Sequence, residues 1–300
     1  MDENDDQQEL NFQYRNHKMF LLSIESVFLG TEDYGSWSFN LEPDVAGIEM
    51  TSVDGSIRGI SFKEASVKWD YQNNRTSFAN ELSIIDLGKV LPLWGFAPSV
   101  ETSSLAMNVD LSWPGSPLNV ELFSTEGEVA IQAGAGRFLD EETSANGLRL
   151  LSIFTPYAIM KRINNFDFSD IVGEGMSFDS LRGATQISYG EIEFTQPLIV
   201  ESRSSTFEFG GKISLIDDSL NNEMIVTLPV SKSLPWYGLY LALANPVAGL
   251  GVVIGEQILR KPIEQFSSAK FQIEGTFEDP TVRFQSLWDT EIALPQKTSE

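Results

Sequence analysis

Short segments in which apolar and polar residues alternate recur along most of the chain. Such alternation is typical of β-strands that bury one face. In the longest segment every second residue is apolar, at Leu105, Met107, Val109, Leu111 and Trp113. Other segments repeat the pattern, with Trp37 and Phe39, Val67 and Trp69, Phe207 and Phe209, and Phe271 and Ile273. The chain is therefore predicted to be mainly β, with one apolar face on each strand.

Turn-forming residues separate several of these strands. They occur at Asp54-Gly55, Pro114 to Pro117, Tyr189-Gly190, Gly210-Gly211 and Asp217-Asp218. Short connections of this kind favour antiparallel hairpins. The apolar face must be covered, and periodicity alone favours closure of the sheet into a sandwich or a barrel. The alternative is an open, curved groove whose apolar lining is left for a ligand.

A first break in the alternation lies at residues 146–166, where an amphipathic helix is predicted. Leu148, Leu151 and Phe154 recur at a spacing that places them on one side of a helix. Lys161 and Arg162 follow them, and positive charge is favourable near the C-terminal end of a helix.

A second break, at residues 233–266, is predicted to form an apolar helical hairpin. No charged residue occurs from Ser233 to Gly255, which is long enough for a membrane-spanning helix. The Asn245-Pro246 pair instead favours two shorter helices, because proline interrupts a helix. Tyrosine and tryptophan favour membrane interfaces, and the candidates for membrane contact here are Trp236, Tyr237, Tyr240, Leu250 and Val253. Capping of the sheet and contact with a membrane are both open, and one hairpin can do both.

These features suggest an order of segments along the chain. We expect an acidic polar leader over 1–18, β-strands over 19–145, the amphipathic helix over 146–166, β-strands over 167–232, the apolar helical hairpin over 233–266, a final β-hairpin over 267–286 and a tail over 287–300. The leader is expected to be disordered, and it is too acidic and polar for a signal peptide or a membrane anchor. If the protein belongs to an envelope compartment, its targeting information lies elsewhere and the chain is expected to be a piece of something longer.

The charge balance excludes one class of partner and restricts another. The chain has 43 Asp and Glu against 20 Lys and Arg, a formal net charge of −23. Such an excess of acid repels nucleic acid backbones. It also disfavours docking on anionic headgroups through a basic patch, so any contact with a membrane is expected to be hydrophobic.

Residues that carry chemistry are scarce. The chain has no cysteine, and its one histidine, His17, lacks the partners of a catalytic triad or a zinc site. Acidic pairs such as Asp167 and Asp170 arise by chance among so many acids, and Gly134-Ala135-Gly136 lacks the third glycine of a dinucleotide loop. We therefore expect no enzyme, no cofactor and no metal.

Several ordered stretches carry a resemblance to a known family. They begin at Asp86 with DLGKVLPLWGF and continue with LSWPGSPLNVELFSTEGEVAIQAGAGRF, NGLRLLSIF, DFSDIVGEGMSFDSLRG, LPVSKSLPWYG, NPVAGLGVVIGEQIL and FQIEGTFEDPTVRF. This series resembles the C-terminal region of the YhdP-type proteins, which are AsmA-like proteins of Gram-negative envelopes. The likeness extends from Met19 to Phe284, with one mild departure at Lys161-Arg162, where paired arginines are expected.

The resemblance implies an extended, curled antiparallel sheet that forms a hydrophobic groove, with amphipathic helices near its C-terminal end. It further implies a periplasmic segment of an inner-membrane-anchored protein that conducts phospholipid toward the outer membrane, with the helical end placed at the outer membrane. The expected groove lining is Trp37, Phe39, Val67, Trp69, Leu105, Met107, Val109, Leu111, Phe207 and Phe209.

Two other functions compete with lipid conduction. In the first, the chain is a periplasmic scaffold whose groove binds an unpaired strand, a partner protein or an outer-membrane component. In the second, it is an enzyme acting on envelope glycans, which would require a carboxylate pair essential for turnover.

Overall fold

The structure, a computed structural model, describes residues 19–117, 120–139, 175–203, 205–227, 268–277 and 279–288. The predicted helical segments at 146–166 and 233–266 lie outside these ranges. The residues predicted for membrane contact or for the helices at the end of the groove therefore lie outside them too, namely Leu148, Leu151, Phe154, Trp236, Tyr237, Tyr240, Leu250 and Val253.

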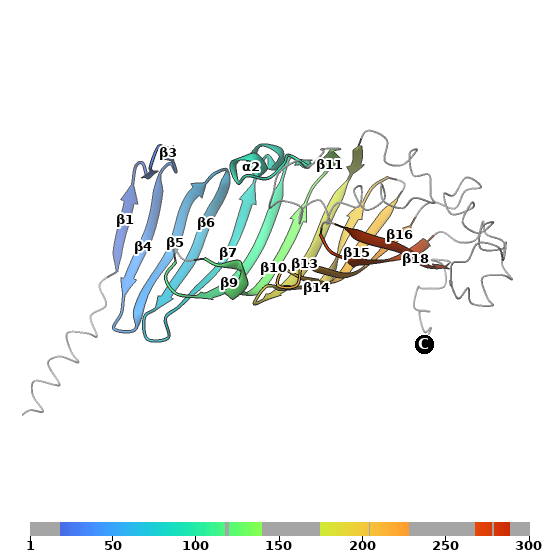
Figure 1. The fold of residues 1–300 in the computed structure, drawn as a ribbon. Helices are drawn as coiled ribbons and strands as arrows, with labels where there is room; N and C mark the ends of the chain where they lie inside the picture. The colour runs from blue at the N-terminus through green and yellow to red at the C-terminus, as the bar shows by residue number, and fades with distance from the viewer. Residues whose placement is uncertain are drawn as a thin grey trace, which may run out of the picture.

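One long antiparallel sheet makes up most of the described chain (Figure 1). Its 13 strands follow in spatial order: β1 (Phe20–Ile24), β4 (Trp37–Pro43), β5 (Gly47–Ile57), β6 (Ile60–Asp70), β7 (Arg75–Ile84), β9 (Leu105–Pro114), β10 (Glu126–Ala133), β13 (Ser180–Ser188), β14 (Glu191–Glu201), β15 (Thr206–Ser214), β16 (Ser219–Thr227), β17 (Ser268–Gly275) and β18 (Pro280–Trp288). Spatial order in this sheet follows chain order, even between β10 and β13 and between β16 and β17, where the strands are far apart in the sequence.

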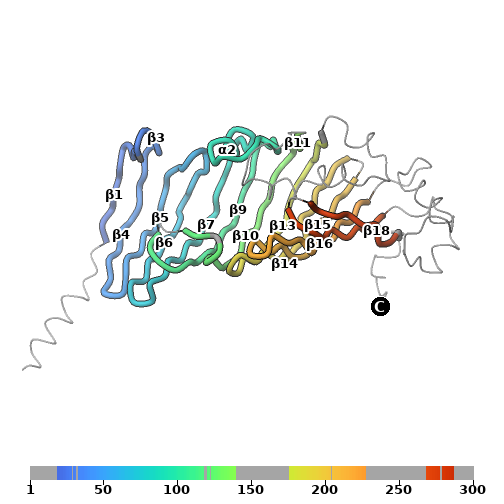
Figure 2. Tube along the Cα trace, viewed as in Figure 1, coloured from blue at the N-terminus to red at the C-terminus, as the bar shows by residue number. Residues whose placement is uncertain are grey.

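The sheet stays open, because β1 forms one edge and β18 the other. The strands of the C-terminal end run steeply across the direction of β1, so the sheet twists and curls along its length (Figure 2). The predicted fold class, an extended and curled antiparallel sheet, is confirmed. Closure into a sandwich or barrel, which periodicity alone favoured, is wrong for the described strands.

Bulges account for part of the curl. The register between β5 and β6 shifts around Val53, and Ser52 and Glu64 adopt positive φ angles of 49° and 54°. The Glu64 backbone N–H donates a hydrogen bond to Asp54 Oδ1 (3.2 Å), which ties the two strands together at the shift. Extra residues on one strand of a pair bend that strand and increase its twist.

Two of the predicted turns lie inside strands, and these predictions are wrong. Asp54-Gly55 belongs to β5, and Gly210-Gly211 belongs to β15. At Gly211 (φ +111°) a Cβ would lie 2.4 Å from the carbonyl oxygen of Asn221 on β16, so glycine is needed there for close strand approach. The predicted turn at Tyr189-Gly190 does join β13 to β14.

Smaller elements lie along one rim of the sheet. They are the helix α2 (Leu87–Leu93) and a three-stranded antiparallel sheet of β12 (Gly175–Phe178), β11 (Gly136–Leu139) and β8 (Val100–Thr102). The short hairpin β2 (Phe28–Leu29) and β3 (Glu32–Asp33) and the 3-10 turn η1 (Leu122–Ser124) complete the described elements. Within the described ranges, no helix is long and apolar enough to cross a membrane.

The best-buried part of the molecule lies toward the C-terminal end of the sheet. Side chains there are fully or almost fully buried, among them Val200, Phe207, Phe209, Ile213, Met224, Val226, Phe271 and Ile273. They belong to one hydrophobic cluster that also includes residues of β11 and β12. This cluster is expected to supply much of the stability of the sheet.

We expect Phe271→Ala to lower the free energy of unfolding by about 3–5 kcal/mol, because it removes a fully buried ring from the core. The matched control is Gln272→Ala, on the other face of the same strand, which should cost less than about 1 kcal/mol. Urea denaturation measures both. Equal costs for the two variants would contradict the assignment of this face to the core.

Candidate functional site

The pairing register places apolar residues of successive strands on the same face of the sheet. Directly paired residues project to one side. One row of such pairs crosses β4, β5, β6, β7 and β9 through Leu41, Met50, Val67, Phe78 and Leu111. Another crosses β7, β9, β10, β13, β14 and β15 through Ile84, Leu105, Ala133, Leu181, Val200 and Phe207. We call this surface the apolar face.

All of the residues predicted to line a groove lie on the apolar face. Trp37 and Phe39 pair with Ile24 and Leu22 of β1, and the Trp37 ring lies 5.5 Å from the ring of Phe62. The remaining pairs are Trp69 with Ile48, Met107 with Leu82, Val109 with Val129, and Phe209 with Leu198. Their role in binding a ligand stays a prediction.

The opposite face is polar. Asn108 and Asp110, which alternate with the apolar residues of β9, are exposed there. Ion pairs also lie on this face, including Lys212 with Glu193 and Arg283 with Glu274, at 3.0 and 3.1 Å. Exposed pairs of this kind contribute little to stability, so this face is best understood as the solvated side of the sheet.

The contribution of one ion pair on the polar face to the stability of the fold depends on pH. The guanidinium of Arg182, followed by the hydroxyl of Ser180, holds the pKa of the Glu201 carboxyl below its usual value by hydrogen bonding. A depressed carboxyl pKa stabilises the fold above the unfolded pKa, and this contribution is lost as the pH falls through the lower, folded pKa.

Burial of the apolar face increases from the N-terminal to the C-terminal end. Every residue of β1 is exposed. Trp37, Phe39, Val67, Trp69, Met107 and Leu111 are half-buried. Leu105 and Val109 are buried, and Phe207 and Phe209 are 0% and 1% exposed within the core. The structure thus brings most of the predicted lining into a partly accessible stretch over β4 to β9, which we call the open section, and places Phe207 and Phe209 in the core.

Two hydrogen-bond donors interrupt the apolar face. Trp69 Nε1 and Asn80 Nδ2 are buried from solvent and have no hydrogen-bond partner among the described residues. Asn80 pairs with Val109, so it lies on the same face as the predicted lining. Buried donors normally find an acceptor, so these two are exceptions within the apolar face.

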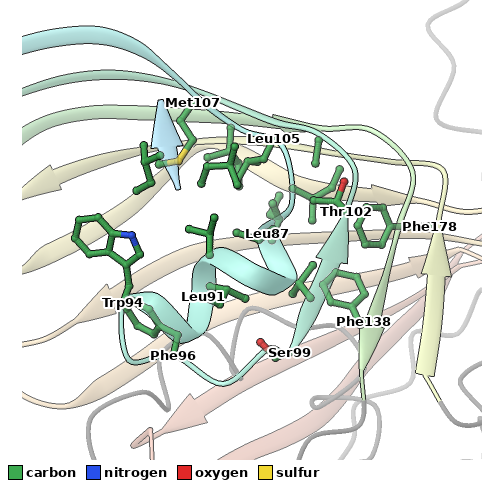
Figure 3. A pocket seen from close by; sticks show the side chains of 18 residues that line it. Leu87, Leu91, Trp94, Phe96, Ser99, Thr102, Leu105, Met107, Phe138 and Phe178 are labelled. Carbon is green, nitrogen blue, oxygen red and sulfur yellow. The ribbon is translucent and has the colours of Figure 1, made fainter. Parts of the chain in front are cut away.

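A cavity of about 380 Å³ lies where α2 and the three-stranded sheet cover the rim of the apolar face (Figure 3). The sheet contributes Ile60, Ile84, Leu105, Met107, Ile131, Ala133, Leu181 and Leu198 to its walls. The cover contributes Leu87, Val90, Leu91, Trp94, Phe96, Ser99, Val100, Thr102, Phe138 and Phe178. Among these residues only Ser99 and Thr102 carry a side-chain hydroxyl, and Trp94 an indole N–H.

Local sequence explains why α2 begins and ends where it does. The side chain of Asp86 accepts a hydrogen bond from the backbone N–H of Lys89 (3.2 Å), as expected of an N-cap residue. The side chain and backbone of Lys89 lower the pKa of Asp86. At the other end, the N–H of Gly95 donates to the Pro92 carbonyl and that of Phe96 to the Leu91 carbonyl, which is a Schellman motif.

The hairpin between β5 and β6 holds α2 in place. Trp94 Nε1 donates a hydrogen bond to the carbonyl oxygen of Arg58 (3.2 Å), and the Arg58 guanidinium lies 5.8 Å from the centre of the Trp94 ring. At Gly59 (φ +82°) a Cβ would lie 2.5 Å from Val90 Cγ2, so the hairpin and the helix are in close contact. The cover is therefore fixed to the sheet at this end of α2.

Sequence reasoning missed α2 and the residues that it adds to the cavity. The segment is too short for a helical period to show against the surrounding strands. Its signals were the N-cap residue Asp86 and the glycine after the helix, Gly95.

Comparison with known proteins decides the family. A family model described as "YhdP protein" matches residues 2–282. This chain belongs to the YhdP family. The intermembrane phospholipid transporter YhdP of Escherichia coli (strain K12) is 28% identical to it over 244 residues, which cover 79% of this chain and 19% of that protein. No solved structure matches.

The family assignment confirms the resemblance drawn from the ordered stretches that begin at Asp86. The chain spans about a fifth of the length of its E. coli YhdP relative.

Replacing Gly59 by alanine should loosen the cover. Gly59 and Gly95 both have positive φ angles, +82° and +80°, but a methyl group added at Gly95 would have no neighbour within 4 Å, whereas one at Gly59 would meet Val90. We expect Gly59→Ala to cost about 1–3 kcal/mol more than Gly95→Ala, because only the former adds overpacking to the backbone strain. Urea denaturation measures the difference, and equal costs would contradict the contact with α2.

Proposed function

We propose that this chain is a non-enzymatic lipid-conducting segment that shields phospholipid acyl chains on its apolar face. The observation that carries the proposal is the continuous apolar face, which is half-buried over the open section from β4 to β9. Contiguous apolar surface that stays accessible on a folded protein is typical of a binding site. A relative named as an intermembrane phospholipid transporter supports phospholipid as the ligand.

The physical need for such a surface follows from the cost of hydrating lipid chains. Moving a lipid with on the order of 30 methylenes through water costs roughly 25 kcal/mol, at about 0.8 kcal/mol for each methylene. A barrier of this size makes spontaneous transfer very slow. A surface of Val, Met, Phe and Trp side chains removes much of the cost while the headgroup stays in water. No covalent step is required.

The unpartnered donors fit the same ligand. Trp69 Nε1 and Asn80 Nδ2 lie on the apolar face without an acceptor among the described residues. The ester carbonyls of a glycerophospholipid lie at the boundary between its chains and its headgroup, and they accept hydrogen bonds. Neither donor atom is accessible to solvent, so a lipid on the open section would satisfy these donors only after the side chains that cover them shift.

The proposal extends to the place of the segment in the cell. Transport between the inner and outer membranes would put the chain in the periplasm, as part of a longer inner-membrane-anchored protein. We propose that the segments at 146–166 and 233–266 contact the outer membrane or its inner leaflet.

A scaffold function is the second candidate, and the edge strand β1 favours it. All of β1 is exposed, including Leu21 at 76%. An exposed edge strand can pair with a strand of a partner protein. A scaffold would bind its partner along this edge and would not need the open section to hold lipid.

A charge on the open section should stop lipid binding. We expect Val67→Asp to reduce transfer of fluorescent phospholipid between vesicles by at least about tenfold, because an unpaired carboxylate beside acyl chains is costly. Its control is Ser77→Asp, an exposed residue of the neighbouring strand β7 that pairs with Lys68 on the polar face. This variant adds the same charge and should transfer lipid as the parent does.

The assay separates the two candidate functions. Loss of transfer in Val67→Asp alone, with an unchanged thermal unfolding midpoint, supports lipid conduction. No transfer by the parent protein, together with cross-links from β1 to a partner protein, would favour the scaffold.

A further inference from the structure

We propose that the cavity beneath α2, at the covered margin of the open section, is a binding site for a single alkyl chain. The cavity would hold the end of one lipid chain while the rest of the lipid lies on the apolar face. This inference rests on the proposed function, because it assumes that lipid reaches this surface. Beyond the proposed function, it assigns the lipid a fixed binding position on its path along the apolar face.

The walls of the cavity come from two different parts of the fold. The floor is the apolar face near the ends of β7, β9, β10 and β13, and the roof is α2 with β8. In Figure 3 Trp94 and Phe96 lie at one end of the cavity, and Phe138 and Phe178 lie at the other. The rings of Phe138 and Phe178 pack 5.0 Å apart. Aromatic side chains thus bound the cavity at both ends.

The chemistry of the lining selects a hydrocarbon. The Thr102 hydroxyl is engaged with the backbone carbonyls of Ser104 and Ala135, each at 3.1 Å. Trp94 Nε1 is engaged with the carbonyl of Arg58. A buried water needs two to four polar partners, and a polar ligand needs them as well. The remaining lining is aliphatic and aromatic apart from Ser99, so a hydrocarbon fits best.

The size of the cavity suits one chain. Its volume of about 380 Å³ is more than twice the roughly 150 Å³ of an engineered cavity that takes benzene, with its six carbons. By that ratio it accommodates on the order of a dozen carbons. Two chains of a phospholipid would not fit together, so the second chain would stay on the open section.

The cavity is continuous with the surface that would deliver the chain. Met107 and Ile131 pair with each other across β9 and β10, and both line the cavity. Each is half-buried, and Met107 also pairs with Leu82 on β7. A chain lying on the apolar face would reach the cavity along these strands without crossing water.

Photo-labelling of the purified chain tests the assignment. The probe is a phosphatidylethanolamine with a diazirine near the end of one acyl chain, supplied in vesicles, and labelled residues are mapped by mass spectrometry. We expect labels in two places in the parent protein: on α2 and its flanks between Leu87 and Phe96, and on β5 and β6 in the open section.

Variants that fill the cavity should remove one set of labels. Ala133 is 4% exposed on the cavity floor, so Ala133→Phe should reduce labelling between Leu87 and Phe96 at least tenfold and leave β5 and β6 labelled. Leu87→Trp fills the cavity from the roof and should do the same. The control is Ala79→Phe, an exposed position on the polar face, and circular dichroism checks that each variant is folded.

The outcomes distinguish failure of the cavity from failure of the proposed function. Phospholipid labels confined to β5 and β6 in the parent protein would overturn the cavity as a site for a phospholipid chain and leave lipid conduction standing. Labels on α2 that persist in both folded filling variants would also overturn it. Labels in neither place would contradict both inferences.

A second probe identifies the source of the alkyl chain. A free fatty acid with the same diazirine is supplied in place of the phospholipid. Labelling of the cavity by both probes supports a chain site that phospholipid can use. Labelling by the fatty acid alone supports a chain site for free fatty acid and removes the cavity from the phospholipid path.

Discussion

The pairing register between strands is the constraint on which the rest of the structure depends. Because side chains alternate with a period of two, a slip of one residue would move a strand's apolar side chains to the solvated face. The pairs from Leu41 through Met50, Val67 and Phe78 to Leu111 keep one unbroken apolar row. The open section, the core and the floor of the cavity are successive parts of the apolar face. They differ in how far other parts of the protein cover them.

The local sequence predicts well on which face of the sheet a side chain lies. It predicts the overall shape of the sheet poorly. Alternation was sufficient to place Met107 and Asn108 on opposite sides of β9, because a strand's period is fixed by its backbone. It could not tell an open sheet from a closed one. That difference arises from strand order and from bulges such as the one at Ser52 and Glu64, whose positive φ angles belong to residues without a turn signature.

Glycine residues and a short helix account for the other errors in the prediction from sequence. Asp54-Gly55 and Gly210-Gly211 look like turns, but the curled sheet uses them inside strands, where Gly211 allows close approach of β16. The helix α2 has seven residues, fewer than a hydrophobic period needs to stand out. It matters more than its length suggests, since it turns one stretch of exposed apolar face into a cavity.

The most direct test of the account uses a photo-crosslinking amino acid at Leu111, and separately at Asp110, in the protein expressed in cells. The two positions are neighbours on β9, with Leu111 half-buried on the apolar face and Asp110 exposed on the polar face. If the apolar face carries lipid, phospholipid adducts form at Leu111 and are absent at Asp110. Adducts to protein alone at Leu111, or equal lipid adducts at both positions, would contradict it.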